Sequence, residues 1–285
     1  MNAAIAVKGA ARRKRLGGWK LAGLAALLVV VVIYNYPIIW MVMTALKEVT
    51  EVYKYPPTVF PLKPVISTFV EAWKAANWPR YLANTLFVAT VVPLCKIVFS
   101  AFAGYALTFK FRGSKLIMIL VLGMMMIPEE TTLVAKYLVV KQFGWVNTYW
   151  ALIVPGMTGA FSIFMFRQFF LTLPSELHDA AVVDGCGDMR YLIAIGLPLA
   201  KSTALTVGLL SFIDEWNSTL WPLIVINNDK LRMVQIALKV FADDGGTTWN
   251  QLMAACCFVT FPILLLFIFV QKYFIDGVAS SGIKG

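Results

Sequence analysis

Six long apolar runs divide this sequence and limit what it can fold into. A helix needs about 20 apolar residues to cross a bilayer, and each run comes near or exceeds that length. The runs are Leu21–Ala45, Leu82–Phe109, Leu116–Val134, Tyr149–Phe170, Thr203–Ile226 and Leu252–Ile275. Only 14% of the residues are charged, whereas an average soluble domain carries about 25%. The sequence therefore predicts an all-α polytopic membrane protein with about six transmembrane helices.

The basic residues predict how this bundle crosses the membrane. Six of them, and no acidic residue, precede the first run. That run is longer than the apolar region of a signal peptide, about 7–15 residues, so we expect a retained helix. The short connection after the second run carries Lys110, Arg112 and Lys115. Basic connections favour the cytoplasm. With six crossings, the N-terminus, the loop Leu173–Ser202 and the C-terminal Lys284 share that side.

The net charge of +10 and the four cysteines do not indicate a nucleic-acid or metal site. The basic residues are dispersed among apolar runs, which membrane topology explains better than nucleic-acid binding. Cys95, Cys186, Cys256 and Cys257 lack the spacing of a zinc site or a disulfide framework. His178 is the single histidine, so histidine-rich metal chemistry is excluded, and we expect it to be solvated or on a docking surface. We expect no metal and no catalytic residue.

Prolines interrupt the third and fourth runs. Pro128 falls near the outer end of the third, where Glu129 and Glu130 can reach water, and Thr131–Phe143 is then expected to follow the interface. Pro155 loosens the fourth run. Broken helices are tolerated where they border protein or a water-filled cavity, so an ordinary packed kink and a cavity lining both stay open.

Charged residues also fall inside the predicted spans. Lys96 lies near the middle of the second, where a lysine costs about 2.5–3.5 kcal/mol, and Asp214 and Glu215 lie near the middle of the fifth. These residues either line a polar solute path, or form an ion pair between Lys96 and one acid, or snorkel toward a wet cavity. Aromatic faces stack on sugar rings, and asparagine offers a donor and an acceptor. The further candidates for the path are therefore Trp216, Asn217 and Trp221.

The loop between the fourth and fifth runs carries charges, glycines and prolines that a bilayer does not hold cheaply. Pro174 can open a helix, with Ser175 near its N-cap and Glu176 in its first turn. Asp184-Gly185 is predicted to end that helix, because glycine accepts the left-handed conformation.

The rest of this loop completes a docking element. Leu177, Ala180 and Ala181 follow one another at helical spacing, and the alanines keep that face thin enough for another surface to approach. Asp188 is expected to cap a second helix, and Pro198 to separate it from the fifth run. We therefore expect a helix, a tight turn and a second helix. A partner bound to this element can move the transmembrane helices through it.

This loop resembles the EAA loop of ABC importer permeases, whose pattern is E-A-A, then D-G-A, then I-x-L-P. The matching segments are Asp179-Ala180-Ala181, Asp184-Gly185-Cys186 and Ile195-Gly196-Leu197-Pro198. Asp179 replaces the usual Glu, Cys186 the usual Ala, and Leu192 stands where an aromatic is usual. The ATPase-coupling residues that the resemblance implies are Glu176, Asp179, Ala180, Ala181, Asp184, Gly185, Leu197 and Pro198.

The resemblance continues from about Tyr81 onward. Phe212–Leu223, FIDEWNSTLWPL, is similar to a segment of maltose-type and glycerol-phosphate-type permeases. Other segments that fit that subfamily are Pro128, Asn147–Tyr149, Arg167–Phe170 and the tail Gly277–Gly285. The resemblance implies that the chain consists of two parts. Residues 1–80 hold the basic segment, the first transmembrane helix and an external loop, and residues 81–285 form the permease core with the coupling loop at about 173–202.

The resemblance also implies a function and partners. The family members are multi-pass subunits of the bacterial or archaeal cell (inner) membrane, with both termini in the cytoplasm, that import a sugar or a related polyol or sugar phosphate. The expected partners are a second homologous permease, two ATP-binding subunits and an extracytoplasmic solute-binding protein. ATP-driven closure of the ATP-binding subunits pushes the two loops together and reorients the spans.

This chain itself is expected to need no cofactor and not to be an enzyme. It has no G-x-x-x-x-G-K-[ST] phosphate-binding segment, so ATP and Mg²⁺ are expected on a partner subunit. The residue pattern leaves two alternatives. An integral membrane enzyme would need a convergent catalytic set, and a secondary transporter or channel would show internal repeats and coupling-ion sites.

Overall fold

The computed structural model describes residues 18–243 and 246–281, and this part of the chain is helical apart from one two-stranded hairpin. The all-α prediction is therefore confirmed. The basic residues Arg12–Arg15 and Lys284, used above to predict orientation, lie outside the described residues. The longer helices are α1 (Gly18–Ala45), α4 (Trp78–Ala106), α5 (Ser114–Met124), α6 (Glu129–Gln142), α8 (Ala160–Leu171), α9 (Ser175–Val183), α12 (Lys201–Asn217) and α15 (Trp249–Ser281). The shorter elements are α2 (Val49–Val52), α3 (Ser67–Lys74), α7 (Tyr149–Ile153), η1 (Val154–Gly156), α10 (Asp188–Tyr191), η2 (Leu192–Gly196), α11 (Leu197–Leu199), α13 (Leu220–Val225), η3 (Asp229–Leu231), α14 (Val234–Ala237), η4 (Leu238–Phe241), β1 (Ala242–Asp243) and β2 (Gly246–Thr247).

Three helices in the described residues, α1, α4 and α15, are each long and apolar enough to cross a bilayer, and three bent helix pairs bring the number to six at most. The predicted interruption of the third run at Pro128 is confirmed, and its first helix, α5, is shorter than the run. It ends at Met124, and α6 begins after a bend of 107°, because Pro128 occupies the N-cap of α6 and proline disfavours a helical residue before it. The fifth run is also shorter than predicted. It ends at Asn217, where Ser218 is extended, and α13 follows as a separate helix.

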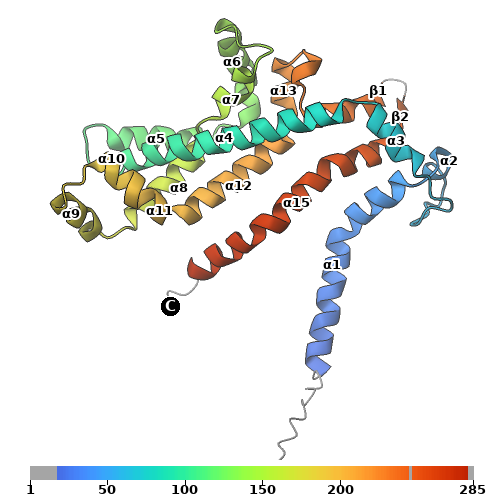
Figure 1. Cartoon of the computed structure of the whole chain (residues 1–285), viewed down its shortest axis with the longest axis horizontal. Coiled ribbons are helices and arrows are strands. Elements are labelled where there is room, and N and C mark those ends of the chain that lie inside the picture. Colours follow the sequence, from blue (N-terminus) through green and yellow to red (C-terminus); the bar gives the residue numbers. More distant parts are fainter. Residues whose placement is uncertain (1–17, 244–245, 282–285) are drawn as a thin grey trace, which may run out of the picture.

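The core of the bundle forms where α4 lies along α8 and α12 (Figure 1). Gly104 lets α4 and α8 approach closely, since a Cβ atom there would lie 2.8 Å from the backbone nitrogen of Arg167. Arg167 then donates from Nε to the carbonyl of Leu107 at 3.0 Å. A lone carbonyl at the end of a helix needs such a partner. The contact fixes α8 to the end of α4 that lies nearest α9.

The first and last helices form a second packing unit at the other end of α4. Ala45 of α1, Trp78 of α4 and Ala254 of α15 share one buried cluster. Away from this cluster α1 diverges from the other helices (Figure 1), and residues 22–37 are exposed in the chain taken alone. An apolar helix with so little protein contact requires lipid or another membrane helix around it.

The segment between α1 and α4 has structure of its own, in the form of α2 and α3. Its centre is Glu51, which accepts hydrogen bonds from Thr58 Oγ1 at 2.6 Å and from the backbone nitrogen of Leu62 at 3.1 Å. The Thr58 bond in particular keeps the pKa of the Glu51 carboxyl below its ordinary value, although burial acts in the opposite direction. The carboxylate therefore stays charged and holds the segment folded.

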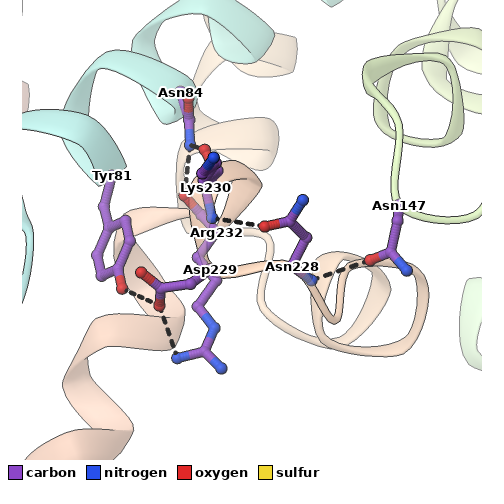
Figure 2. A network of polar contacts seen from close by, with 7 residues as sticks. All are labelled: Tyr81, Asn84, Asn147, Asn228, Asp229, Lys230 and Arg232. Carbon is purple, nitrogen blue, oxygen red and sulfur yellow. Dashed lines mark hydrogen bonds and ion pairs between the residues drawn. The ribbon is translucent and has the colours of Figure 1, made fainter.

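A polar network joins three segments at the end of the bundle opposite α9 (Figure 2). Asn84 of α4 donates to the carbonyls of Lys230 and Arg232 at 3.0 and 2.9 Å. Tyr81 donates to Asp229, which also pairs with Arg232 at 3.1 Å. These bonds attach the η3 turn to α4, and Leu231 of η3 adds apolar contact with the cluster that contains Val88 and Val92 of α4.

Asn147 completes this network from the turn before α7. Its Oδ1 accepts from the backbone nitrogens of Asn227 and Asn228 at 2.6 and 3.0 Å. Its own backbone is left-handed, with φ of 62°, a conformation that asparagine tolerates better than most residues. The segment Asn147–Tyr149, noted above for its resemblance, thus has a structural role.

We expect Asn147→Ala to lower the free energy of unfolding by about 1–3 kcal/mol, because it strains the backbone and leaves two backbone donors without an acceptor. Thermal unfolding of the purified chain in detergent measures this. Asn147→Gly is the matched control, since it relieves the strain and loses only the acceptor, and it should cost less. Equal stability of the alanine variant and the wild type would contradict the role assigned to Asn147.

Candidate functional site

The loop between α8 and α12 begins with a short helix that ends on a Schellman motif. Gly185 has φ of +73°, and its backbone nitrogen donates to Val182 at 2.9 Å while that of Cys186 donates to Ala181 at 2.8 Å. These are the two bonds that define the motif. The predicted helix stop at Asp184-Gly185 is confirmed, and the turn direction of the loop depends on one glycine.

Two local details of this loop differ from the prediction. Pro174 rather than Ser175 occupies the N-cap of α9, and Gly187 rather than Asp188 occupies the N-cap of α10, so Asp188 supplies a first-turn acid instead of a capping side chain. In addition, Pro198 lies within a helical run. The break comes at Ala200, where the chain bends by 76° between Asp188–Leu199 and α12.

The base of the loop is packed against the bundle. Tyr191 and Leu192 are buried together with Tyr105 of α4 and Phe170 of α8. The rings of Tyr105 and Tyr191 stack at 6.0 Å. Any force on the loop therefore reaches α4 and α8 through close aromatic packing rather than through a flexible linker.

His178 joins the two halves of the loop. Its Nε2 lies 3.0 Å from Asp188 Oδ1, and its ring meets Tyr191 edge-on at 5.0 Å. The expectation of a merely solvated or docking histidine is thus incomplete, since the ring is half-buried against Tyr191. The contact holds α9 against the first turn of α10.

The outer face of the loop is exposed and carries both acidic and apolar side chains. Of the residues predicted for coupling, Ala181 is buried and Leu197 half-buried, whereas the others are exposed: Glu176, Asp179, Ala180, Asp184, Gly185 and Pro198. The predicted thin alanine face therefore splits, because Ala181 packs inward and Ala180 outward. The structure adds exposed apolar side chains that the sequence pattern did not single out, Val182, Val183, Met189 and Ile193, with Val183 87% exposed.

A second site is a cavity of about 330 Å³ between α4, α5, α8 and α12. Two predicted path residues line it, Lys96 from α4 and Asp214 from α12. Ser162 of α8 and Ser211 of α12 also line it. The sequence reading missed both serines, since a single serine in an apolar helix has no distinctive pattern. The only available signal was the break at Pro155 that precedes α8.

The other predicted path residues lie outside this cavity. Glu215 faces η1, with Oε1 3.0 Å from the position a Cβ on Gly156 would take. Trp216 is buried at 2% exposure, and Asn217 donates to Ile213 at 2.9 Å. Trp221 donates from Nε1 to the carbonyl of Ala151 at 2.9 Å. The Lys136 ammonium lies above the Trp221 ring, 4.5 Å from its centroid.

Lys96 forms no ion pair with Asp214 or Glu215 in residues 18–243 and 246–281. The pair considered from the sequence is therefore not formed in this structure. Asp214 lines the cavity with Lys96, whereas Glu215 turns toward η1. A lysine at this depth without a paired acid is costly, and such residues usually face a polar cavity.

Comparison with known proteins gives one family and several relatives. Residues 96–280 match the family described as "Binding-protein-dependent transport system inner membrane component". The chain is 33% identical over 257 residues to the probable ABC transporter permease protein YurM of Bacillus subtilis (strain 168), covering 88% of this chain and 84% of that protein. It is 31% identical to the arabinooligosaccharides transport system permease protein AraQ of Halalkalibacterium halodurans, covering 88% and 91%.

Two further comparisons extend over nearly the whole chain. The sn-glycerol-3-phosphate transport system permease protein UgpE of Brucella abortus (strain 2308) is 29% identical over 271 residues, covering 92% of this chain and 96% of that protein. A chain from the crystal structure of a bacterial ABC transporter involved in the import of the acidic polysaccharide alginate superimposes with a TM-score of 0.77 at 20% identity, covering 90% and 96%. At that identity the structural match shows the fold alone.

Proposed function

The chain belongs to the family of binding-protein-dependent transport system inner membrane components, and we propose that its loop Leu173–Ser202 is where a separate ATP-hydrolysing subunit drives it. As a member of this family it is a permease subunit of a sugar ABC importer. Its homologues are transporters rather than enzymes. The loop then lies in the cytoplasm, as do both termini.

The observation that carries this proposal is the contrast between the two faces of the loop. The inner face packs on α4 and α8 through Tyr191 and Leu192, whereas the outer face leaves Val183 and Met189 in solvent. Exposed apolar side chains on a rigid element are typical of a binding surface. A partner that binds this face moves α4 and α8 with it, because the base of the loop is packed against both helices.

The relatives suggest the solute class and the remaining partners. They are named for the transport of arabinooligosaccharides and sn-glycerol 3-phosphate, so the proposed solute is a sugar or a related polyol or sugar phosphate. The proposed assembly holds a second homologous permease, two ATP-binding subunits and an extracytoplasmic solute-binding protein. The exposed apolar surface of α1 over residues 22–37 supports a second membrane subunit beside it.

Val183→Asp tests this proposal. A carboxylate placed in an apolar interface must lose its water without gaining a partner. We expect the amount of ATPase subunit that copurifies with the tagged chain to fall at least about tenfold, as for a residue central to an interface. Val240→Asp is the matched control, because Val240 is also an exposed valine but lies in η4 at the opposite end of the bundle. Undiminished copurification of the ATPase subunit with Val183→Asp would contradict the proposed docking face.

A further inference from the structure

Helix α8 begins inside the cavity between α4, α5, α8 and α12. Its N-cap residue Gly159 and its first-turn residues Ala160, Phe161 and Ser162 all line the cavity. Gly159 has no side chain to cap the helix, and the described residues provide no side-chain acceptor for these first-turn N–H groups. The start of a helix carries free donors and a positive dipole end, and both favour an anion.

Two serine hydroxyls in the same cavity, one of them from α12, also point to a ligand. Ser162 and Ser211 are each only 4% exposed, and both line the cavity. Neither hydroxyl forms a hydrogen bond within the part of the chain that the structure describes. Both residues are buried, but neither Oγ is fully enclosed by protein, so each hydroxyl is open to the cavity, where a ligand can pair with it.

Lys96 brings a positive charge to the start of α8. A Cβ atom on Gly159 would lie 3.6 Å from Lys96 Cδ and 3.5 Å from Ser162 Oγ. The lysine stem and the serine hydroxyl thus converge on one point at the helix N-terminus. An ammonium, two hydroxyls and free backbone N–H groups together form a set of donors suited to a phosphate or carboxylate.

Asp214 is the opposing charge in this cavity, and it is exposed. A carboxylate at the rim weakens anion binding without occupying the donors, which suits a transporter that must release its solute. Lys96 lies ten residues before the end of α4, about 15 Å along a helix. It also lies 18 residues after the start of α4, so it is far from both ends of this apolar helix and therefore from lipid headgroups. The volume of about 330 Å³ falls in the range of ligand cavities, about 300–1,000 Å³.

We infer that this cavity is an anion-binding subsite on the transport path, in which Lys96, Ser162, Ser211 and the N-terminus of α8 receive a phosphate or carboxylate group of the solute. The inference rests on the proposed transport function and narrows its solute class to anionic sugars or polyols. Neutral sugars satisfy the hydroxyls but offer no negatively charged group to the lysine.

Saturation-transfer NMR on the assembled importer in phosphatidylcholine nanodiscs tests the inference with two probes, D-glucuronate and D-glucose, which differ in the carboxylate at C6. We expect glucuronate to bind and glucose to bind at least about tenfold more weakly. Lys96→Met should weaken glucuronate binding about tenfold or more, while Lys96→Arg retains it and the control Lys115→Met, outside the cavity, leaves it unchanged. Asp214→Asn should tighten it, and inorganic phosphate should compete.

Three results would overturn the inference: equal binding of glucuronate and glucose to the wild type, unchanged glucuronate binding in Lys96→Met, or weaker binding in Asp214→Asn. Nanodiscs that contain phosphatidylglycerol separate the two sources of the anion. Unchanged glucuronate binding there supports a solute subsite, whereas competition by the lipid assigns the donors to a headgroup and overturns it. ATPase activity stimulated by the binding protein is measured on the same preparation. If this ATPase activity persists while glucuronate and glucose bind equally well, only this inference fails. If no ATPase subunit copurifies, the proposed function fails.

Discussion

Gly185→Val is expected to abolish solute uptake while the chain still inserts in the membrane. Gly185 has φ of +73°, and a β-branched residue in the left-handed region is strongly disfavoured. The Schellman motif then opens, and α9 loses the angle at which it presents its outer face. We expect uptake by the importer in proteoliposomes to fall at least about tenfold, because a misplacement of about 1 Å in a positioned element costs that much or more. ATP hydrolysis should become independent of the solute-binding protein.

Gly187 provides the control for this variant. It is two residues away, a Cβ atom there meets nothing within 4 Å, and its φ is −77°. Gly187→Val therefore changes the same turn by the same side chain without backbone strain and should keep most of the uptake. Gly185→Asn should recover part of it, because asparagine tolerates the left-handed conformation. Normal uptake by Gly185→Val would show that the shape of this turn does not matter for coupling.

Gly104→Leu is expected to prevent correct packing of the bundle. A Cβ atom at residue 104 would lie 2.8 Å from the backbone nitrogen of Arg167 and 2.9 Å from Phe166 Cβ, and neither atom can move without shifting α8. Even Gly104→Ala should lower the free energy of unfolding by about 1–3 kcal/mol, as in other overpacked cores. The leucine variant should give no monodisperse peak in size-exclusion chromatography, and the alanine variant a lowered melting temperature.

Gly123→Ala is the matched control for Gly104→Ala. Gly123 also lies in a helix, α5, but a Cβ atom there meets nothing within 4 Å. Alanine has a higher helix propensity than glycine by about 1 kcal/mol, so this variant should be as stable as the wild type or more stable. A stabilising effect of Gly104→Ala would mean that α4 and α8 are not in close contact in the membrane.

The coupling loop and the cavity share α8 as a common element. Phe170 near its end packs beside Tyr191 of the loop, and Ser162 in its first turn lines the cavity. A displacement of the loop therefore moves α8 as one rigid helix. The N-terminus of α8 then changes its position relative to Lys96 on α4. In the proposed cycle, docking of the ATP-binding subunit and release of the anionic group are linked through this one helix.

Features that depend on neighbours along the chain could be predicted from the amino-acid sequence. The apolar runs predicted an all-α membrane protein, Pro128 predicted the break before α6, and Gly185 predicted the end of α9. Each rule acts over one or two helical turns, so it can be applied without knowing the packing. The loop pattern around Asp184 was specific enough to indicate the family.

Contacts between residues far apart in the chain could be read only from the folded bundle. Ala180 and Ala181 are adjacent in sequence, yet only Ala181 packs inward, because the contacts of His178 with Asp188 and Tyr191 set which face of α9 is buried. Lys96 and Asp214 share a cavity without pairing, and Ser162 joins them from a third helix. These contacts depend on the crossing angles of α4, α8 and α12, which arise from side-chain packing between helices far apart in the chain. No pattern within a single helix carries that information.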